Sequence, residues 1–197
     1  MHPVMRLATV DDAQQLQSIY TPTVAETAVS FELEPPSVEE MRRRIETTLL
    51  TLPWVVYDSD GVVGYGYAGL FRLRPAYQWT VEVTVYVHAA HRRKGVARAL
   101  YTSLFECLRM QGYRTALAVI ALPNPASVAL HERMGFRSIG VFHAVGHKLG
   151  AWHDVAWWEL ALQSPPDPPP RPQTLPEVAN SDAWRAALTK GMAATAR

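Results

Sequence analysis

Residues 80–100 read TVEVTVYVHAAHRRKGVARAL, which is an alternating strand followed by a basic loop and the start of a helix. Side chains alternate along the strand 80–87, so Glu82, Thr84 and Tyr86 share one face and the four valines share the other. A carboxylate in so apolar a strand is costly unless it is paired or functional. Glu82 is therefore a candidate catalytic base, and the alternatives are a solvent-facing residue or an ion pair with a nearby arginine.

The loop 92–97, RRKGVA, leads directly from this strand into a predicted helix. Gly95 lets the backbone approach an anion closely, and the first N–H groups of the helix are unpaired and favour negative charge. Arg92, Arg93 and Lys94 add positive charge. The position after a strong strand favours a pyrophosphate site over a merely solvated basic helix start.

Outside this stretch the hydrophobic period alternates between that of strands and that of helices. We expect helices after Thr9, after Ser37, over 95–111 and over 125–134. The expected strands are 4–8, 54–57, 62–70, 80–87, 115–121, 138–145 and 154–162. This order, β-α-α-β-β-β-α-β-α-β-β, predicts an α+β domain with helices on the faces of a mixed sheet.

The composition changes sharply after residue 163. Seven of the fifteen prolines lie in 164–180, which we interpret as an extended linker, because proline fixes φ and removes a donor. We expect a domain over 1–163 and a tail over 181–197. Ser181 can cap one short helix in that tail, and a helix of this length is stable only if it docks.

Charge and cysteine usage narrow the class of protein. The net charge of +1 in 197 residues argues against nucleic acid or an anionic membrane as the main partner. A single cysteine, Cys107, excludes an internal disulfide framework. No apolar run approaches the roughly 20 residues of a membrane span, and the start of the chain has no signal-peptide pattern. We expect a cytoplasmic protein.

Two patterns are misleading. Residues 64–69, GYGYAG, match G-x-G-x-x-G, but they lie inside a predicted strand and do not open a helix, so we reject a dinucleotide site there. The seven histidines include no H-E-x-x-H pair, so we expect no metal.

Arg92-x-x-Gly95-x-Ala97 resembles the (Q/R)-x-x-G-x-(G/A) pyrophosphate motif of the GNAT superfamily of N-acetyltransferases. WTVEVTVYV, the segment from LYTSLF to ERMGF, and KLGAWHDVAWWEL resemble the phosphinothricin acetyltransferase branch, so the similarity spans about 4–163. The resemblance implies the GNAT fold, a mixed and mostly antiparallel twisted sheet with helices on both faces. It also implies acetyl-CoA as co-substrate and a homodimer.

The resemblance assigns roles residue by residue. Glu82 and His131 would be catalytic, with His131 as acid or second base, although a lone helix histidine is more often structural. The residues that would bind acetyl-CoA are Val85, Tyr86, Val87, Arg92, Arg93, Lys94, Gly95, Val96, Ala97 and Asn124. The residues that would bind the acceptor are Phe31, Arg74, Tyr77, Trp79 and Thr80. Asn124 before Pro125 also suits a turn, and the arginines near 72–74 suit a solvated loop.

The function expected from this resemblance is acetyl transfer from acetyl-CoA to the primary amine of a small amino acid such as phosphinothricin, methionine sulfone or methionine sulfoximine. Other GNAT acceptors, a polyamine or a protein N-terminus, are the first alternative. A non-catalytic acyl-CoA-binding module, which would keep residues 92–97 without needing Glu82, is the second. Nucleic-acid binding through the basic loop is disfavoured by the near-neutral charge balance.

Overall fold

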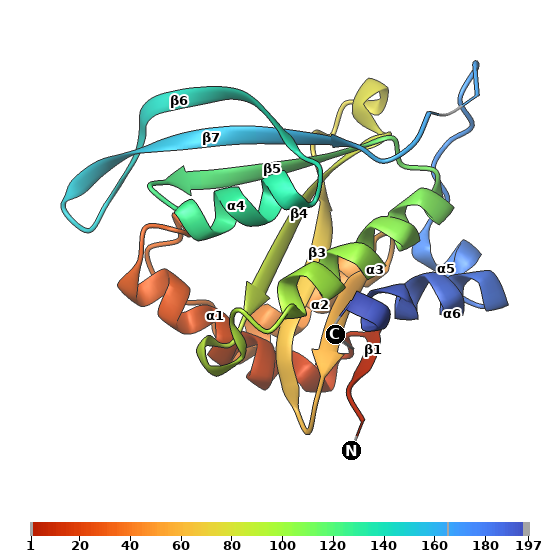
Figure 1. Cartoon of the computed structure of the whole chain (residues 1–197), viewed down its shortest axis with the longest axis horizontal. Helices are drawn as coiled ribbons and strands as arrows, with labels where there is room; N and C mark the ends of the chain where they lie inside the picture. The colour runs from red at the N-terminus through yellow and green to blue at the C-terminus, as the bar shows by residue number, and fades with distance from the viewer. Residues whose placement is uncertain (1, 165, 195–197) are drawn as a thin grey trace.

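The computed structural model describes residues 2–164 and 166–194. Seven strands form one sheet in the order β1-β2-β3-β4-β5-β7-β6 (Figure 1). Every neighbouring pair is antiparallel except β4 and β5, which are parallel. The strands are β1 Val4–Leu7, β2 Trp54–Asp58, β3 Val62–Leu70, β4 Thr80–Val87, β5 Thr115–Leu122, β6 Arg137–Lys148 and β7 Ala151–Ala161. The predicted α+β fold is confirmed, and the β6–β7 hairpin is longer than the sequence indicated.

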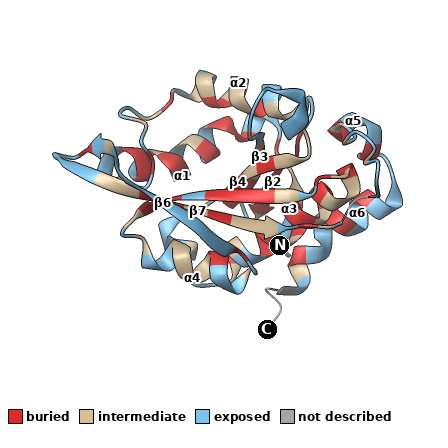
Figure 2. Cartoon of the chain, turned by 90° about the horizontal axis from the view of Figure 1, so that it is seen from above, coloured by how far each residue is buried: buried red, intermediate tan, exposed pale blue. Residues whose placement is uncertain are grey.

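Helices cover both faces of the sheet, and their buried sides face it (Figure 2). The helices are α1 Ala13–Glu26, α2 Val38–Leu49, α3 Val96–Gln111, α4 Pro125–Arg133, α5 Leu175–Val178 and α6 Asp182–Thr189. Helices α1 and α2 pack on one face, whereas α3 and α4 pack on the other. None of the helices in the described ranges is both long enough and apolar enough to cross a membrane.

The helix starts follow the local sequence chemistry. Thr9 and Asp12 form a reciprocal capping box before α1, and the Ser37 side chain accepts a hydrogen bond from the backbone N–H of Glu40 at the start of α2. Gly112 ends α3 in the left-handed conformation, which glycine adopts without a steric penalty. Caps and stops were therefore predictable from short spacings.

Side chains alternate along β4, so the strand contributes to two apolar clusters on opposite faces of the sheet. Val81 and Val83 are buried in the cluster that contains α3. Tyr86, on the opposite face, packs against the cluster formed with α1 and α2. The sheet thus separates two apolar layers, and Glu82 lies on the α1–α2 side.

The glycines of the GYGYAG segment lie within β3, where the chain passes close to α3. A Cβ at Gly64 would lie 3.0 Å from the Tyr86 carbonyl oxygen and 3.1 Å from Val96 Cγ1. A Cβ at Gly66 would lie 3.3 Å from the Thr84 carbonyl oxygen. Close packing explains Gly64 and Gly66, as the strand interpretation predicts, whereas a Cβ at Gly69 would meet open space.

The C-terminal segment folds back onto α3. Trp184 of α6 is almost fully buried beside Cys107, and Gly191 donates its backbone N–H to Ser103 Oγ. The Gln173 N–H donates to the backbone carbonyl of Gln111, while the Gln111 side chain donates back to the Gln173 carbonyl. Packing against the domain stabilises the short α6, since eight residues form a marginal helix in isolation.

Candidate active site

The sheet opens between β4 and β5. Their ladder runs from Thr80 opposite Thr115 to Glu82 opposite Leu117 and then ends, and the two strands diverge (Figure 1). Backbone groups of 83–87 that face β5 therefore have no ladder partner within the described residues. A cleft lies at this opening, lined by Val83, Thr84, Val85, Tyr86, Ala118, Val119, Ile120, Ala121, Asn124, Ser127, His131, Tyr101 and Val29.

The start of α3 is built to receive an anion. Gly95 takes the N-cap position with φ +82° and offers no side-chain cap, so the N–H groups of the first turn lack an internal partner. Arg92, Arg93 and Lys94 are exposed and form no ion pair with any described residue. Free N–H groups, the helix dipole and unpaired cations together suit a pyrophosphate.

Glu82 is half-buried at the last paired position of β4, next to the opening. Burial raises the pKa of its carboxyl, and the positive charge of Arg72 partly offsets that rise. No described residue donates a hydrogen bond to this carboxylate. A carboxylate with a raised pKa and free oxygens is suited to accept a proton.

His131 is buried on α4, and its ring nitrogens lie within hydrogen-bond distance of Ser127 and Tyr101. Its Nδ1 lies 2.8 Å from the Ser127 carbonyl oxygen, which only accepts, so Nδ1 carries the proton. In the neutral ring Nε2 is then an acceptor, and the Tyr101 hydroxyl, 3.0 Å away, donates to it. Burial lowers the pKa of His131, which favours this neutral form.

Asn124 combines a structural position with a place in the cleft. Its Oδ1 accepts the N–H of Ser127 and so caps α4, which fits the turn interpretation. It also lines the opening between β4 and β5. The cap leaves the amide nitrogen of Asn124 available to a ligand.

A family model described as Acetyltransferase (GNAT) domain matches residues 5–157. The chain belongs to the GNAT acetyltransferase family. It is accordingly an acetyl-CoA-dependent N-acetyltransferase, and the α3 start and β4–β5 opening occupy the matched region. The GNAT identification made from the basic loop is confirmed.

Relatives of this acetyltransferase cover most of its length. A phosphinothricin N-acetyltransferase of Streptomyces viridochromogenes is 40% identical over 169 residues, which is 85% of this chain and 91% of the relative. An L-methionine sulfoximine/L-methionine sulfone acetyltransferase of Salmonella typhimurium is 33% identical over 160 residues, 80% of this chain and 94% of the relative. A Sinorhizobium meliloti phosphinothricin acetyltransferase solved with acetyl-CoA superposes with a TM-score of 0.81 at 33% identity, covering 90% and 98% of the two chains.

The acceptor-binding candidates of this GNAT chain occupy two loops and the first position of β4. Arg74 and Tyr77 are exposed between β3 and β4, and Thr80 begins β4. Trp79 donates its Nε1–H to the Pro170 carbonyl oxygen at 2.8 Å, so the C-terminal segment holds its polar atom.

Phe31 lies in the loop between α1 and α2 and contacts the β6–β7 hairpin. Its ring centroid is 6.2 Å from that of His153, and a Cβ at Gly146 would overlap the ring. Lys148 anchors the same loop, because its buried Nζ donates to the carbonyl oxygens of Val24 and Ser30 at 2.6 and 2.7 Å. The loop is therefore held against the β6–β7 hairpin.

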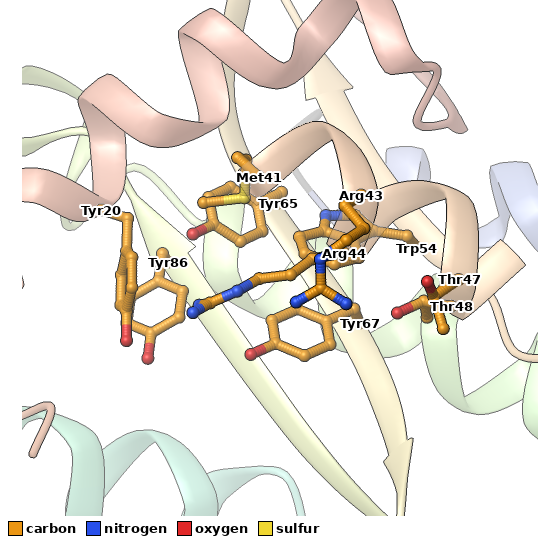
Figure 3. A pocket seen from close by; sticks show the side chains of 10 residues that line it. All are labelled: Tyr20, Met41, Arg43, Arg44, Thr47, Thr48, Trp54, Tyr65, Tyr67 and Tyr86. Atoms are coloured by element: carbon orange, nitrogen blue, oxygen red, sulfur yellow. The ribbon is translucent and has the colours of Figure 1, made fainter. Parts of the chain in front are cut away.

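Sequence reasoning missed three features of the site. Tyr101, the partner of His131, comes from α3, thirty positions away, and no local pattern links the two. Arg72, not Arg74, is the arginine whose charge lowers the pKa of Glu82. An aromatic cavity next to α2 also has no sequence motif (Figure 3). Three or more potential metal-ligating side chains do not gather anywhere in 2–164 or 166–194.

Proposed function

We propose that this acetyltransferase acetylates the α-amino group of small amino acids of the phosphinothricin or methionine sulfoximine type. The observation that carries the proposal is Glu82, a half-buried carboxylate of raised pKa at the end of the β4–β5 ladder. Arg72 lies near enough to act on its pKa, and its guanidinium suits the acidic group of such an acceptor. Relatives named for these two acceptors support the choice.

Glu82 is the proposed base. An ammonium cannot attack a thioester, because the proton occupies its lone pair. Glu82, directly or through a water, takes that proton, and the free amine then attacks the carbonyl carbon of the acetyl group. A backbone N–H near Val85, in the part of β4 without a ladder partner, stabilises the oxyanion.

The Tyr101–His131 pair is the proposed proton donor to the leaving sulfur. As the C–N bond forms and the C–S bond breaks, the nitrogen loses a proton and the thiolate gains one. Both residues line the cleft, and neutral His131 accepts a hydrogen bond from the Tyr101 hydroxyl through Nε2. Tyr101 gives its hydroxyl proton to the sulfur, and the proton that the nitrogen loses returns to Tyr101, directly or through a water, so the net proton balance of the pair is zero over one turnover.

The proposed acetyl-CoA site begins at the N-terminus of α3. The residues from Arg92 to Ala97 would hold the pyrophosphate of acetyl-CoA, while Val85, Tyr86 and Val87 would pair with its pantetheine arm through their backbone. Asn124 would meet the thiol end of the arm. Fixing both substrates at one opening supplies part of the rate acceleration.

The test is coenzyme A release from acetyl-CoA with L-phosphinothricin, L-methionine sulfoximine and spermidine as separate acceptors. Saturable release with the two amino acids but not with spermidine is expected. Release with spermidine alone would show that the acceptor is a polyamine and not a small amino acid. Glu82→Gln should abolish most of the release, whereas Glu39→Gln, an exposed carboxylate on α2, serves as the matched control.

A further inference from the structure

A cavity of about 210 Å³ lies between α2 and the sheet face that carries Glu82 (Figure 3). Its walls come from α1, α2, β2, β3 and β4, and no sequence motif predicts it. We call it the aromatic cavity. The residues that define it are Tyr20, Arg44, Trp54, Tyr65, Tyr67 and Tyr86.

The five rings of the aromatic cavity contact one another in a continuous series. The Trp54 and Tyr67 rings stack with centroids 4.2 Å apart and an interplanar angle of 16°. Tyr65 and Tyr86 follow at 5.4 Å, and Tyr20 meets Tyr86 edge-on at 4.8 Å. Such flat ring walls suit a planar ligand, which gains offset-stacked or edge-to-face contacts.

The two charged groups that line the cavity, Arg43 and Arg44, are already balanced, and Arg43 donates to both oxygens of Glu40. Arg44 donates to both oxygens of Glu32 and, through Nε, to Glu40 at 2.8 Å. Burial raises the pKa of Tyr67 to about 12, so its hydroxyl is neutral at physiological pH. Because Glu32 and Glu40 already neutralise the arginine charge, a charged ligand finds no unpaired partner among the lining residues, and an uncharged ligand fits best.

One polar atom in the wall lacks a partner. Trp54 is 2% exposed, and its Nε1–H is buried without a hydrogen-bond acceptor among the described residues. Leaving a buried donor unpaired costs about 1–3 kcal/mol. A bound water, whose oxygen accepts, would remove that cost, whereas an indole or phenyl ring has no acceptor atom for it.

The aromatic cavity adjoins the reaction cleft. Tyr86 lines both spaces, and Tyr67 of the cavity is the cross-strand partner of Thr84, which lines the cleft. Glu82 lies on the same face, two residues before Thr84. An apolar cavity of about 150 Å³ accommodates benzene, so one of 210 Å³ has room for an aromatic ring and its linking methylene.

We propose that the aromatic cavity is a subsite for the uncharged planar side chain of an acceptor amino acid, such as an indole or phenyl ring. The proposal rests on the proposed function for the acetylation of that amino acid, but not for the binding of the ring. It extends the acceptor range from amino acids of the phosphinothricin or methionine sulfoximine type to aromatic ones.

Binding is measured first, without acetyl-CoA, by saturation-transfer NMR with indole as the probe. We expect transfer from the wild-type protein to the indole protons. Thr48→Phe, which places a ring into the cavity from α2, should reduce it about tenfold or more. Thr47→Phe blocks the exposed end of the same cavity and covers the case in which the first variant fails to fold.

The matched control is Glu46→Phe, which adds the same ring to an exposed position of α2 outside the cavity wall. Transfer should persist in this variant. No transfer to wild type, or equal transfer in Thr48→Phe, Thr47→Phe and wild type, overturns the proposal.

Turnover separates this inference from the proposed function. Coenzyme A release with L-tryptophan should fall more than release with L-phosphinothricin in Thr48→Phe, by about tenfold in the ratio of kcat/KM values. Indole binding without turnover of any amino acid would keep the subsite and refute the proposed function. Turnover of L-phosphinothricin without indole binding would support the proposed function and refute the subsite.

Discussion

The two sides of strand β4 are built in different ways. The donor side, where acetyl-CoA is expected, comes from one continuous piece of chain that runs from β4 through the basic loop into α3. The side on which we propose that the acceptor binds is assembled from distant elements: α1, α2 and strands β2 to β4. A binding site made of consecutive backbone is visible in a sequence, whereas a site made of converging side chains is not.

The largest expected effect is the loss of turnover when Glu82, on the proposed acceptor side, is replaced. Glu82→Gln removes the proposed base, so kcat should fall about 10²–10⁴-fold. Because burial raises the pKa of Glu82, the wild-type rate should rise with pH through a midpoint above about 4.3, the ordinary value for glutamate. The measurement is the pH–rate profile for L-phosphinothricin.

In Glu82→Gln that acidic limb should vanish, while the affinity for acetyl-CoA, measured by calorimetry, should stay the same. Full turnover by this variant at neutral pH would show that Glu82 is not the base. The exposed Glu39→Gln should keep the wild-type profile.

A smaller effect is expected on the donor side. Gly95 has φ +82°, and an L-residue in that region costs roughly 1–2 kcal/mol. Gly95→Ala should therefore raise the KM for acetyl-CoA about tenfold with little change in the KM for the amine. Gly140→Ala, with open space around its Cβ and no positive φ, is the control. An unchanged KM for acetyl-CoA in Gly95→Ala would argue against the loop as the pyrophosphate site.

The buried Tyr101–His131 pair should make the free energy of unfolding depend on pH. Burial lowers the pKa of folded His131, whereas an unfolded histidine titrates near 6.5. As the pH falls below about 6.5 the unfolded state binds the proton first, so the free energy of unfolding should drop by up to about 1.4 kcal/mol per pH unit.

Denaturant unfolding of wild type and His131→Asn between pH 7.5 and 5.5 measures this contribution. The variant should lack it, so its stability should depend less steeply on pH. His147→Asn, at an exposed position of β6, should keep the wild-type slope. Equal slopes in all three proteins would contradict a neutral, buried His131.

Much of the fold was predictable because its signals are local. The alternation in β4, the capping box at Thr9 and the stop at Gly112 each depend on a few neighbouring residues. The Tyr101–His131 bond and the ring stack of Trp54 on Tyr67 depend on how distant elements pack. Periodicity shows which face of a helix is buried, but not which side chain of another element it meets.

The smallest expected effect concerns the loop before β4. Trp79→Phe removes the hydrogen bond to the Pro170 carbonyl, and a neutral bond of this kind contributes about 0.5–1.5 kcal/mol. Thermal unfolding should show a modest drop in Tm, and the KM for the amine should rise while that for acetyl-CoA should not. Trp152→Phe, at a largely exposed tryptophan, is the control. An unchanged Tm and amine KM would mean that the C-terminal segment does not support this loop.

The most direct test of the two-sided site is the pair of Michaelis constants, for acetyl-CoA and for L-phosphinothricin, in Gly95→Ala and Arg72→Gln. We expect Gly95→Ala to raise only the constant for acetyl-CoA and Arg72→Gln to raise only that for the amino acid, each by about tenfold. If both constants rise together in both variants, β4 does not separate a donor side from an acceptor side, and the account is wrong.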